Sequence, residues 1–291
     1  MPTDHVHVSP SWPELRAEVD DVLVGFLEDK RAELAALHPA ASTLADELLR
    51  LVRSGGKRLR PALGYWGYRM ADGVPDGRIM RAAASLELFH TFALIHDDVM
   101  DDSQVRRSVP AVHEHVRSAA ARDQALFGVS AAIVIGDLAA VWADELLLTS
   151  GFDPSALTRA LARAYAIRRD MAVGQFLDIA GEAAAGEAAG RLAANLKGGR
   201  YTVTGPLLMG AELASEGPIG GNLLHTLVAF GEPLGEAFQL KDDLDDGDAA
   251  HGATADTVKH SIAEALTALG AAGSPPMPVA ALTELAMLVK A

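Results

Sequence analysis

The stretch LIHDDVMDDSQVRR, residues 94–107, combines four aspartates with two arginines. In a helix, Asp97 and Asp101 lie one turn apart on the same face, with Asp98 beside them. Carboxylates at this spacing repel one another unless a cation neutralises them. They also end an apolar segment, where the helix dipole is negative and disfavours aspartate. The pattern therefore indicates either a solvated helix end or a binding site for a cation.

A second acidic group repeats this arrangement. FQLKDDLDDGD, residues 238–248, places Asp242, Asp243 and Asp246 at the same spacing. Two such groups on two long helices suggest carboxylates that face each other across a cavity. A calcium loop fits poorly because its glycine and terminal glutamate are missing, and a di-iron bundle needs a pair of Glu-x-x-His motifs. Since Mg²⁺ binds through one or two carboxylates plus substrate phosphate, a magnesium–diphosphate clamp is the interpretation that remains.

Basic residues at two positions complement the acidic groups. SGGKRLRP, residues 54–61, starts a helix after two glycines, so that Lys57 and Arg60 lie near a helix N-terminus, where phosphate binding is favourable. Arg106 and Arg107 supply planar donors for phosphate oxygens. Each basic group alone is typical of a protein surface. Two acidic groups and two basic pairs together predict a site for two diphosphates.

Composition limits the class of protein. The 291 residues are 49% hydrophobic but only 5% aromatic, and long Ala/Leu/Glu/Arg stretches favour helix. We expect one all-α domain over residues 1–291. A net charge of −14 argues against a general nucleic-acid binder, and the absence of cysteine excludes disulfides and thiol chemistry. With neither a secretory leader nor about 18 uninterrupted apolar residues, we expect a cytoplasmic protein without stable membrane insertion.

The Gly and Pro residues fall between long periodic segments, and no convincing alternating strand is present. The segment 77–102 is apolar on nearly every side, which predicts a central helix. The predicted helices are 11–37, 42–53, 57–71, 77–102, 120–149, 154–180, 186–199, 201–214, 220–245, 255–270 and 277–290.

The motifs GGKRLRP, LIHDDVMDDSQVRR, GQFLD, LKGGRYTV and FQLKDD occur in this order between residues 54 and 246. This combination resembles the trans-isoprenyl diphosphate synthases of the polyprenyl synthetase family. One aspartate motif alone would be weak, because class I terpene cyclases also carry one. The resemblance implies a single-domain helical bundle around a central apolar cavity, and a cytoplasmic homodimer.

The resemblance also implies roles for individual residues. Magnesium, three ions per active site, would be bound by Asp97, Asp98, Asp101, Asp242, Asp243 and Asp246. Arg106 would contact the allylic diphosphate. Isopentenyl diphosphate would be held by Lys57, Arg60, His90 and Arg107. The reaction centre would be lined by Lys197, Gln175 and Gln239, with Asp97 and Asp98 also catalytic, and Asp178 would support the second metal group.

The implied chemistry follows from charge. Magnesium and arginine neutralise the leaving diphosphate, so that the allylic C–O bond ionises to a carbocation in an apolar, water-poor cavity. The double bond of isopentenyl diphosphate attacks this cation, and the released diphosphate takes the proton that is then lost.

The residues before the first aspartates give a partial prediction of the length of the product. Ala93, Phe92 and Phe89 lie one to two turns before Asp97, and Phe92 is a plausible floor for the growing chain. In the family, an aromatic at this position with a small neighbour points to fifteen or twenty carbons. We expect geranylgeranyl diphosphate, with farnesyl diphosphate as the alternative. Simple core packing is the competing interpretation of Phe92.

The chain departs from the family pattern in three places. Gly198 stands after Lys197, where the family normally has threonine. Lys241 replaces a position where other residues are common. The text DDGDAAHGATADTVKH runs almost directly into what resembles the final helices: either this region is shortened, or the printed sequence joins two segments across a stretch it leaves out. We expect the second, in which case Asp246 would not be the fifth residue of its motif.

Two other hypotheses remain open. A non-catalytic subunit of a heteromeric synthase is mildly supported by Gly198 and by the missing lysine boxes. A diverged enzyme that ionises or cyclises one diphosphate predicts loss of the isopentenyl site, but Lys57, Arg60 and Arg107 are all present.

Overall fold

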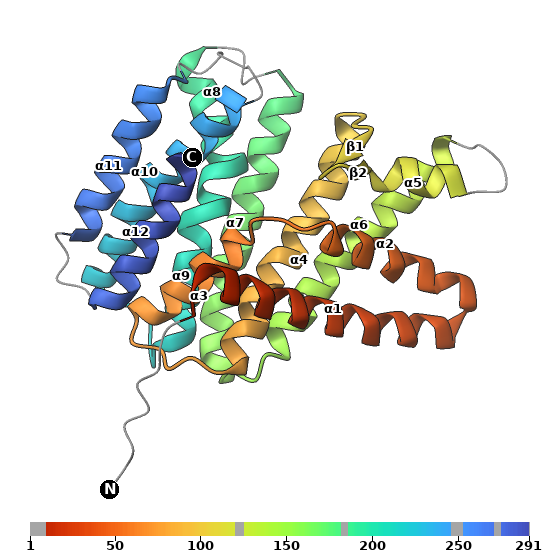
Figure 1. Ribbon diagram of the computed structural model, residues 1–291, viewed down its shortest axis with the longest axis horizontal. Helices are drawn as coiled ribbons and strands as arrows, with labels where there is room; N and C mark the ends of the chain where they lie inside the picture. The colour runs from red at the N-terminus through yellow and green to blue at the C-terminus, as the bar shows by residue number, and fades with distance from the viewer. Residues whose placement is uncertain (1–9, 120–124, 182–185, 246–252, 271–274, 291) are drawn as a thin grey trace, which may run out of the picture. The chain divides into compact units, whose positions relative to one another are not determined.

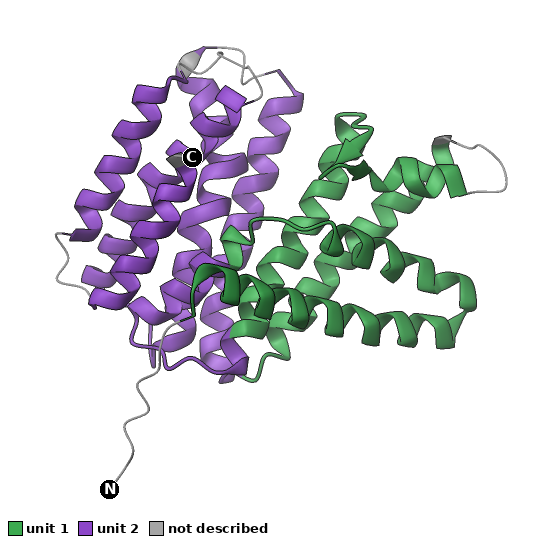
Figure 2. Ribbon diagram, viewed as in Figure 1, with its two compact units in different colours: residues 1–61, 80–151 green, residues 62–79, 152–291 purple. Residues whose placement is uncertain are grey.

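The computed structural model describes residues 10–119, 125–181, 186–245, 253–270 and 275–290 (Figure 1). Contacts divide the chain into two compact units, unit 1 with residues 1–61 and 80–151, and unit 2 with residues 62–79 and 152–291 (Figure 2). Almost all of the described secondary structure is helical, which confirms the all-α class. The single-domain organisation stays a prediction.

Unit 1 is built on α1 and α2, which pack against each other. The carboxylate of Glu14 accepts hydrogen bonds from the N–H and the hydroxyl of Ser11, at 2.7 Å each, and so caps the start of α1. Lys30 on α1 is buried and forms a 2.5 Å ion pair with Glu145 on α6. The elements of this unit are α1 (Trp12–Leu37), η1 (Pro39–Ala41), α2 (Ser42–Arg53), most of α4 (Gly77–Met100), β1 (Val105–Arg106), β2 (Val109–Pro110), α5 (Val112–Ala119) and α6 (Ala125–Leu148).

Helix α4 has the buried character that its sequence predicts, since residues 82–89 are all buried. It ends at Met100 rather than at residue 102. Asp101 and Asp102 form a turn in which Asp102 has a φ of 51°, a left-handed conformation that stops the helix. The carboxylates therefore lie where the helix ends and the chain reverses.

The segment after α4 contains two short strands and a helix, although its sequence predicted neither, so that prediction was wrong. Val105 pairs with Pro110 and Arg106 with Val109 in a short antiparallel hairpin. Its two central residues, Arg107 and Ser108, have φ values of 51° and 64°, as a tight hairpin turn requires. Because neither is glycine or asparagine, the usual hairpin signal is missing. The short helix α5 follows directly and was also missed.

Among the described helices, α6 contains a segment, Leu126–Leu148, that is long and apolar enough to cross a membrane by length and composition. In its most apolar stretch of 18 residues, 39% is buried within the protein. Core helices also meet this criterion. The ion pair between Lys30 and Glu145 shows that this helix packs against α1 within unit 1.

Unit 2 is a group of helices centred on α10, which packs on α11, α12 and η3 (Figure 2). Helix α7 packs on α8, α9 and η3. Asp153 caps α7 by accepting the N–H of Ser155 at 2.8 Å. The elements of this unit are most of α3 (Leu59–Met70), α7 (Pro154–Ile179), α8 (Glu187–Ala194), η3 (Asn195–Thr204), α9 (Gly205–Ala214), α10 (Gly221–Asp245), α11 (Ala255–Gly270) and α12 (Pro276–Lys290).

The chain does not break at residue 200 as predicted, because η3 is a π-helix that links α8 to α9 without interruption. Its glycines bring backbones together rather than ending the helix. A Cβ added at Gly235 on α10 would lie 2.7 Å from the Gly199 carbonyl oxygen, and one at Gly174 on α7 would lie 2.3 Å from the Lys197 nitrogen. Close approach to both neighbouring helices thus fixes the position of η3.

The contact between α10 and η3 predicts a stability change. Replacing Gly235 with alanine puts a methyl group against the backbone of Gly199, which cannot move aside as a side-chain tip could. We expect Gly235→Ala to lower the free energy of unfolding by about 1–3 kcal/mol, measured by urea denaturation. Gly221→Ala is the control, because a Cβ there meets nothing within 4 Å. Equal stability of the two variants would contradict this packing.

Candidate active site

The last turn of α4 carries the first acidic group. Asp98 is 1% exposed, and its Oδ1 accepts hydrogen bonds from Arg106 Nε at 2.8 Å and Nη2 at 2.5 Å. Arg106 Nη2 also lies 3.4 Å from Asp97 Oδ2. The N–H of Asp101 donates to the carbonyl of Asp97 at 2.9 Å, which keeps Asp101 one turn further along. The hairpin that the sequence analysis missed thus carries the cation that balances this group.

Asp98 has the properties of a ligand for a hard cation. Burial raises the pKa of its carboxyl group, and the hydrogen bond and charge of Arg106 oppose this rise. Its second oxygen, Oδ2, is buried and has no hydrogen-bond partner among the described residues. Leaving such an oxygen unpaired costs about 1–3 kcal/mol. A carboxylate oxygen in this state fits Mg²⁺, although the described residues contain no group of three or more His, Asp and Glu side chains close enough to hold a metal ion.

Basic side chains surround His90, which lies two turns before Asp97 on α4. Burial lowers the pKa of His90 well below its usual value, and the charges of Arg60, Arg107, Arg106 and Arg58 lower it further. His90 is therefore neutral at pH 7 among several permanent cations. Unit 1 thus brings together four of the side chains that were predicted to bind diphosphates: Arg60, His90, Arg106 and Arg107.

Lys57 and Arg60 lie near a helix N-terminus, as predicted. Helix α3 begins at Leu59, so that Arg60 is in its first turn and Lys57 precedes it by two residues. Residues 55–58 are not helical, which corrects the predicted start at residue 57. Positive φ values at Gly55, Gly56 and Arg58 reverse the chain here.

Two charged residues of unit 1 were missed by the sequence analysis. Arg58 and Glu87 are both buried and form a 2.6 Å ion pair. A signal existed for Glu87, which stands three residues before His90 and so lies on the same face of α4. Arg58 gave no signal, because its type does not distinguish it from the basic residues on either side.

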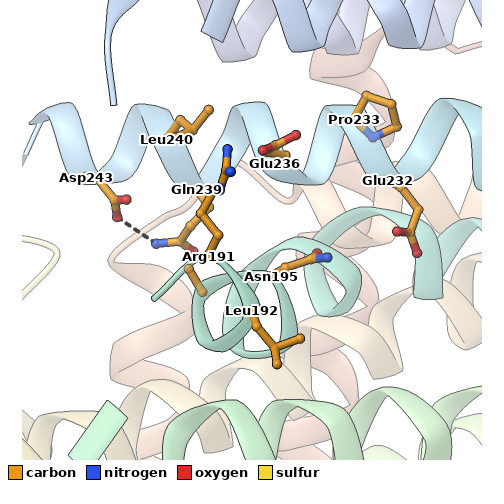
Figure 3. Close-up of a pocket in the computed structure, with 10 residues that line it drawn as sticks. Arg191, Leu192, Asn195, Glu232, Pro233, Glu236, Gln239, Leu240 and Asp243 are labelled. Carbon is orange, nitrogen blue, oxygen red and sulfur yellow. Dashed lines mark hydrogen bonds between the residues drawn. The ribbon is translucent and has the colours of Figure 1, made fainter. Parts of the chain in front are cut away.

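Unit 2 carries the second group of predicted site residues. Lys197 on η3 donates from Nζ to Asp178 Oδ2 on α7 at 2.8 Å. Gln239 donates from Nε2 to Asp243 Oδ1 at 2.9 Å, one turn along α10 (Figure 3). Asp243 is 9% exposed, whereas Asp242 is exposed. Each residue of these two pairs is thus hydrogen-bonded to another predicted residue within unit 2.

The remaining predicted residues of this unit are less informative. Gln175 follows Gly174, the point where α7 touches η3. Asp246 lies outside the described residues. Lys241, which had no interpretation from sequence, donates to Asp245 one turn along α10, so it forms a local ion pair on the helix surface.

A cavity of about 330 Å³ opens in unit 2 between α10 and the segment formed by α8 and η3. Gln239, Leu240 and Asp243 line one side, and Figure 3 shows Glu232 further along the same helix. Arg191 on α8 and Asn195 on η3 line the opposite side of the cavity. The cavity therefore has polar groups beside the residues that the sequence analysis assigned to the reaction centre and the second metal group.

Two of the three residues proposed to limit product length, Phe89 and Phe92, form a row of rings on α4 together with His96. The rings of Phe89 and Phe92 have centroids 5.1 Å apart, and the ring of Phe92 lies 4.6 Å from that of His96. Phe89 is 7% exposed, whereas Phe92 and Ala93 are half-buried. Phe92 therefore lies between the rings of Phe89 and His96.

Comparison with known proteins identifies the family of this chain. The Polyprenyl synthetase family model matches residues 41–262. A short chain isoprenyl diphosphate synthase of Methanothermobacter thermautotrophicus is 32% identical over 78% of this chain and 66% of its own length. A (2E,6E)-farnesyl diphosphate synthase of Mycobacterium tuberculosis is 33% identical over 65% of this chain and 48% of its own length. The chain thus spans less than two thirds of either curated relative.

A solved structure extends the likeness over nearly the whole chain. The geranylgeranyl pyrophosphate synthase of Corynebacterium glutamicum, solved with isoprenyl diphosphate and magnesium, has a TM-score of 0.88 and 26% identity, covering 97% of this chain and 99% of that one. The fold, an all-α bundle with acidic groups at helix ends, and the match over residues 41–262 define the class. This chain belongs to the polyprenyl synthetase family.

The position of Gly198 predicts a local rearrangement. A Cβ at residue 198 would lie 2.1 Å from Gln239 Oε1, so any larger residue must displace that carboxamide. Because Oε1 is the tip of a flexible side chain, we expect Gly198→Ala to change the free energy of unfolding by less than about 1 kcal/mol while breaking the bond from Gln239 to Asp243. A crystal structure of the variant would show the loss of the hydrogen bond from Gln239 to Asp243. Retention of that bond with alanine in place would contradict the prediction.

Proposed function

We propose that this chain is a magnesium-dependent prenyltransferase that condenses isopentenyl diphosphate with an allylic diphosphate, with geranylgeranyl diphosphate as its main product. The observation that carries the proposal is the end of α4 in unit 1. There, the buried Asp98 keeps one oxygen without a hydrogen-bond partner among the described residues, and Arg106 and the basic residues around His90 lie close by. Oxygen ligands for a hard cation beside several guanidinium groups fit a metal-bound diphosphate.

Each predicted residue has a role in this proposal. The carboxylates of the two aspartate groups would hold magnesium, and the bound metal would supply positive charge that balances the leaving diphosphate of the allylic substrate. Arg106 donates to the same diphosphate. Lys57, Arg60, His90 and Arg107 bind isopentenyl diphosphate, and the neutral imidazole of His90 can donate a hydrogen bond without adding charge.

The reaction breaks the allylic C–O bond and forms a C–C bond to the double bond of isopentenyl diphosphate. Lys197, Gln175 and Gln239 lie near the developing allylic cation in this assignment. Asp178 holds the Lys197 ammonium through their 2.8 Å contact, so that the ammonium has a fixed position. The proton lost from the condensed product passes to the released diphosphate, and no protein base is required.

Product analysis tests the proposal. The protein is incubated with Mg²⁺, isopentenyl diphosphate and an allylic starter of C5, C10 or C15, and chain length and released diphosphate are measured. We expect a linear C20 product, with C15 as the alternative, because relatives with both product names match the chain. Diphosphate release without condensation would favour a cyclase-like enzyme. No turnover in any mixture would favour a non-catalytic subunit.

Asp98→Asn tests whether this carboxylate binds a metal ion. Asparagine keeps the shape of the side chain but removes the anionic partner of Arg106, so the thermal midpoint should fall, although burial, which raises the pKa of the carboxyl group, limits the loss at pH 7. In the folded variant, kcat should drop by about 100-fold and Mg²⁺ binding should weaken in calorimetry. Asp102→Asn is the control, since Asp102 is exposed and lies in the turn. Full activity of the Asp98 variant would exclude it as a magnesium ligand.

Phe92 predicts a change in product length. Removing its ring from between Phe89 and His96 opens space along α4. We expect Phe92→Ala to shift products to longer chains by at least one C5 unit, with kcat within about tenfold of the original. Phe127→Ala on the exposed side of α6 is the matched control and should leave the products unchanged. An unaltered distribution for the Phe92 variant would mean that this ring serves only packing.

The homodimer and the cytoplasmic location that the family resemblance implies stay predictions.

A further inference from the structure

Arg58 is a fully buried guanidinium with every nitrogen hydrogen-bonded. It is 1% exposed and is among the largest side chains that are completely enclosed. Its Nε donates to Asp20 Oδ1 at 2.6 Å and its Nη2 to the Val52 carbonyl at 2.7 Å. Its Nη1 donates to Glu87 Oε1 at 2.6 Å and to the Gly55 carbonyl at 3.3 Å. One side chain therefore ties α1, the end of α2, the following turn and α4 together.

Arg107 shares two of these acceptors. Its Nη2 lies 3.2 Å from Glu87 Oε1, and its Nη1 donates to the Gly55 carbonyl at 2.5 Å. The Arg107 side chain is 20% exposed, whereas that of Arg58 is fully enclosed. Of these two guanidinium groups, Arg107 alone can reach a ligand, and the acceptors that fix its position are also bound by Arg58.

The backbone of the turn is fitted to the same two side chains. Gly56 has a φ of 152°, and a Cβ there would lie 2.8 Å from Arg58 Nη1 and 3.0 Å from Arg107 Nη2. Arg58 itself has a φ of 52°, which is disfavoured for a residue with a side chain. Such a conformation persists where surrounding contacts enforce it. The side-chain bonds of Arg58 supply these contacts and so set the path of the chain between Lys57 and Arg60.

Charge balance explains why a buried arginine is tolerated here. Arg58 and Arg107 contribute two positive charges, and Asp20 and Glu87 contribute two negative charges in direct contact with them. The charge of Arg58 is thus neutralised by carboxylates of the protein and is not available to a ligand. A planar guanidinium can bond several acceptors in fixed directions, whereas an ammonium group is a single point charge.

We propose that Arg58 and Glu87 are positioning residues for the diphosphate of isopentenyl diphosphate, because they hold the turn 54–57 and the Arg107 guanidinium in the geometry that binds it. This inference rests on the proposed prenyl transfer. Neither residue touches the substrate. They act through Arg107 and through Lys57 and Arg60, the neighbours of Arg58 in the chain.

The test compares Arg58→Lys with the original protein in two assays. Lysine keeps the charge but loses the directed bonds to Asp20, Val52 and Glu87, so the turn and Arg107 should lose their fixed positions. We expect KM for isopentenyl diphosphate to rise by about 10- to 100-fold while KM for the allylic substrate stays within about threefold. Calorimetric titration with inorganic diphosphate in EDTA should show a similar loss of affinity, and this assay needs no catalysis.

Two further variants keep the result interpretable. Arg53→Lys is the matched control, because Arg53 makes an exposed ion pair with Glu28 in the same unit, and it should change neither KM. Asp20→Asn leaves Arg58 in place but weakens one of its bonds, so KM for isopentenyl diphosphate should rise by roughly three- to tenfold. If circular dichroism shows that Arg58→Lys does not fold, Asp20→Asn decides.

A folded Arg58→Lys variant with unchanged KM for isopentenyl diphosphate would overturn the inference. An equal rise in both KM values, or no change for Asp20→Asn, would also overturn it, because each indicates a general structural role. Failure of the proposed function is a separate outcome: the original protein would then form no prenyl product. In that case the diphosphate titration still decides whether Arg58 positions an anion site.

Discussion

The site in unit 1 depends on burying opposite charges as contacting pairs. Asp98 with Arg106, and Glu87 with Arg58, place carboxylates and guanidinium groups at the end and on the flank of an apolar helix. Removing one partner of such a pair typically costs about 3–5 kcal/mol, because the other charge stays buried. The pairs therefore restrict which conformations the loops at residues 54–58 and 101–110 can adopt. Their value lies in fixed geometry rather than in net stability.

Unit 2 uses a different device to place its polar groups. Here the contacts between α10, η3 and α7 are made by backbone against backbone at Gly199, Gly235 and Gly174. The close approach of η3 to α7 brings Lys197 within reach of Asp178, whereas Gln239 contacts Asp243 one turn along α10 itself. The π-helix fits this packing, because its wider turn shifts the register of the residues that follow. The glycines at residues 198 and 199 thus serve packing where the sequence suggested a break.

The sequence was sufficient to predict those parts of the candidate site whose position depends only on residue spacing within one helix. Helical periodicity after the apolar run places Asp97 and Asp98 in the last turn of α4, and Asp101 follows directly in the turn. Their acidic crowding requires a nearby cation such as Arg106. The sequence was insufficient to predict the features that depend on contacts between residues far apart in the chain. Nothing in the order Lys57, Arg58, Arg60 reveals which side chain is enclosed, because that depends on carboxylates 38 residues before and 29 residues after Arg58. The hairpin at residues 105–110 was hidden for a related reason: contacts enforce left-handed conformations on residues that do not favour them.

The location of the positive charge makes the proposed diphosphate binding compatible with an acidic protein. A net charge of −14 would repel a diphosphate if it were spread evenly near the site. Exposed charges are screened beyond about 8–10 Å at physiological ionic strength, whereas partly buried charges are screened much less. The arginines around His90 are of the second kind, since burial of Arg106 and Arg107 limits their contact with water. Their field therefore dominates locally, and the neutral imidazole avoids adding a further charge that would have to be buried. The same reasoning accounts for Glu87: by balancing Arg58, it lets the turn keep an enclosed guanidinium for geometry while Arg107 remains available for binding.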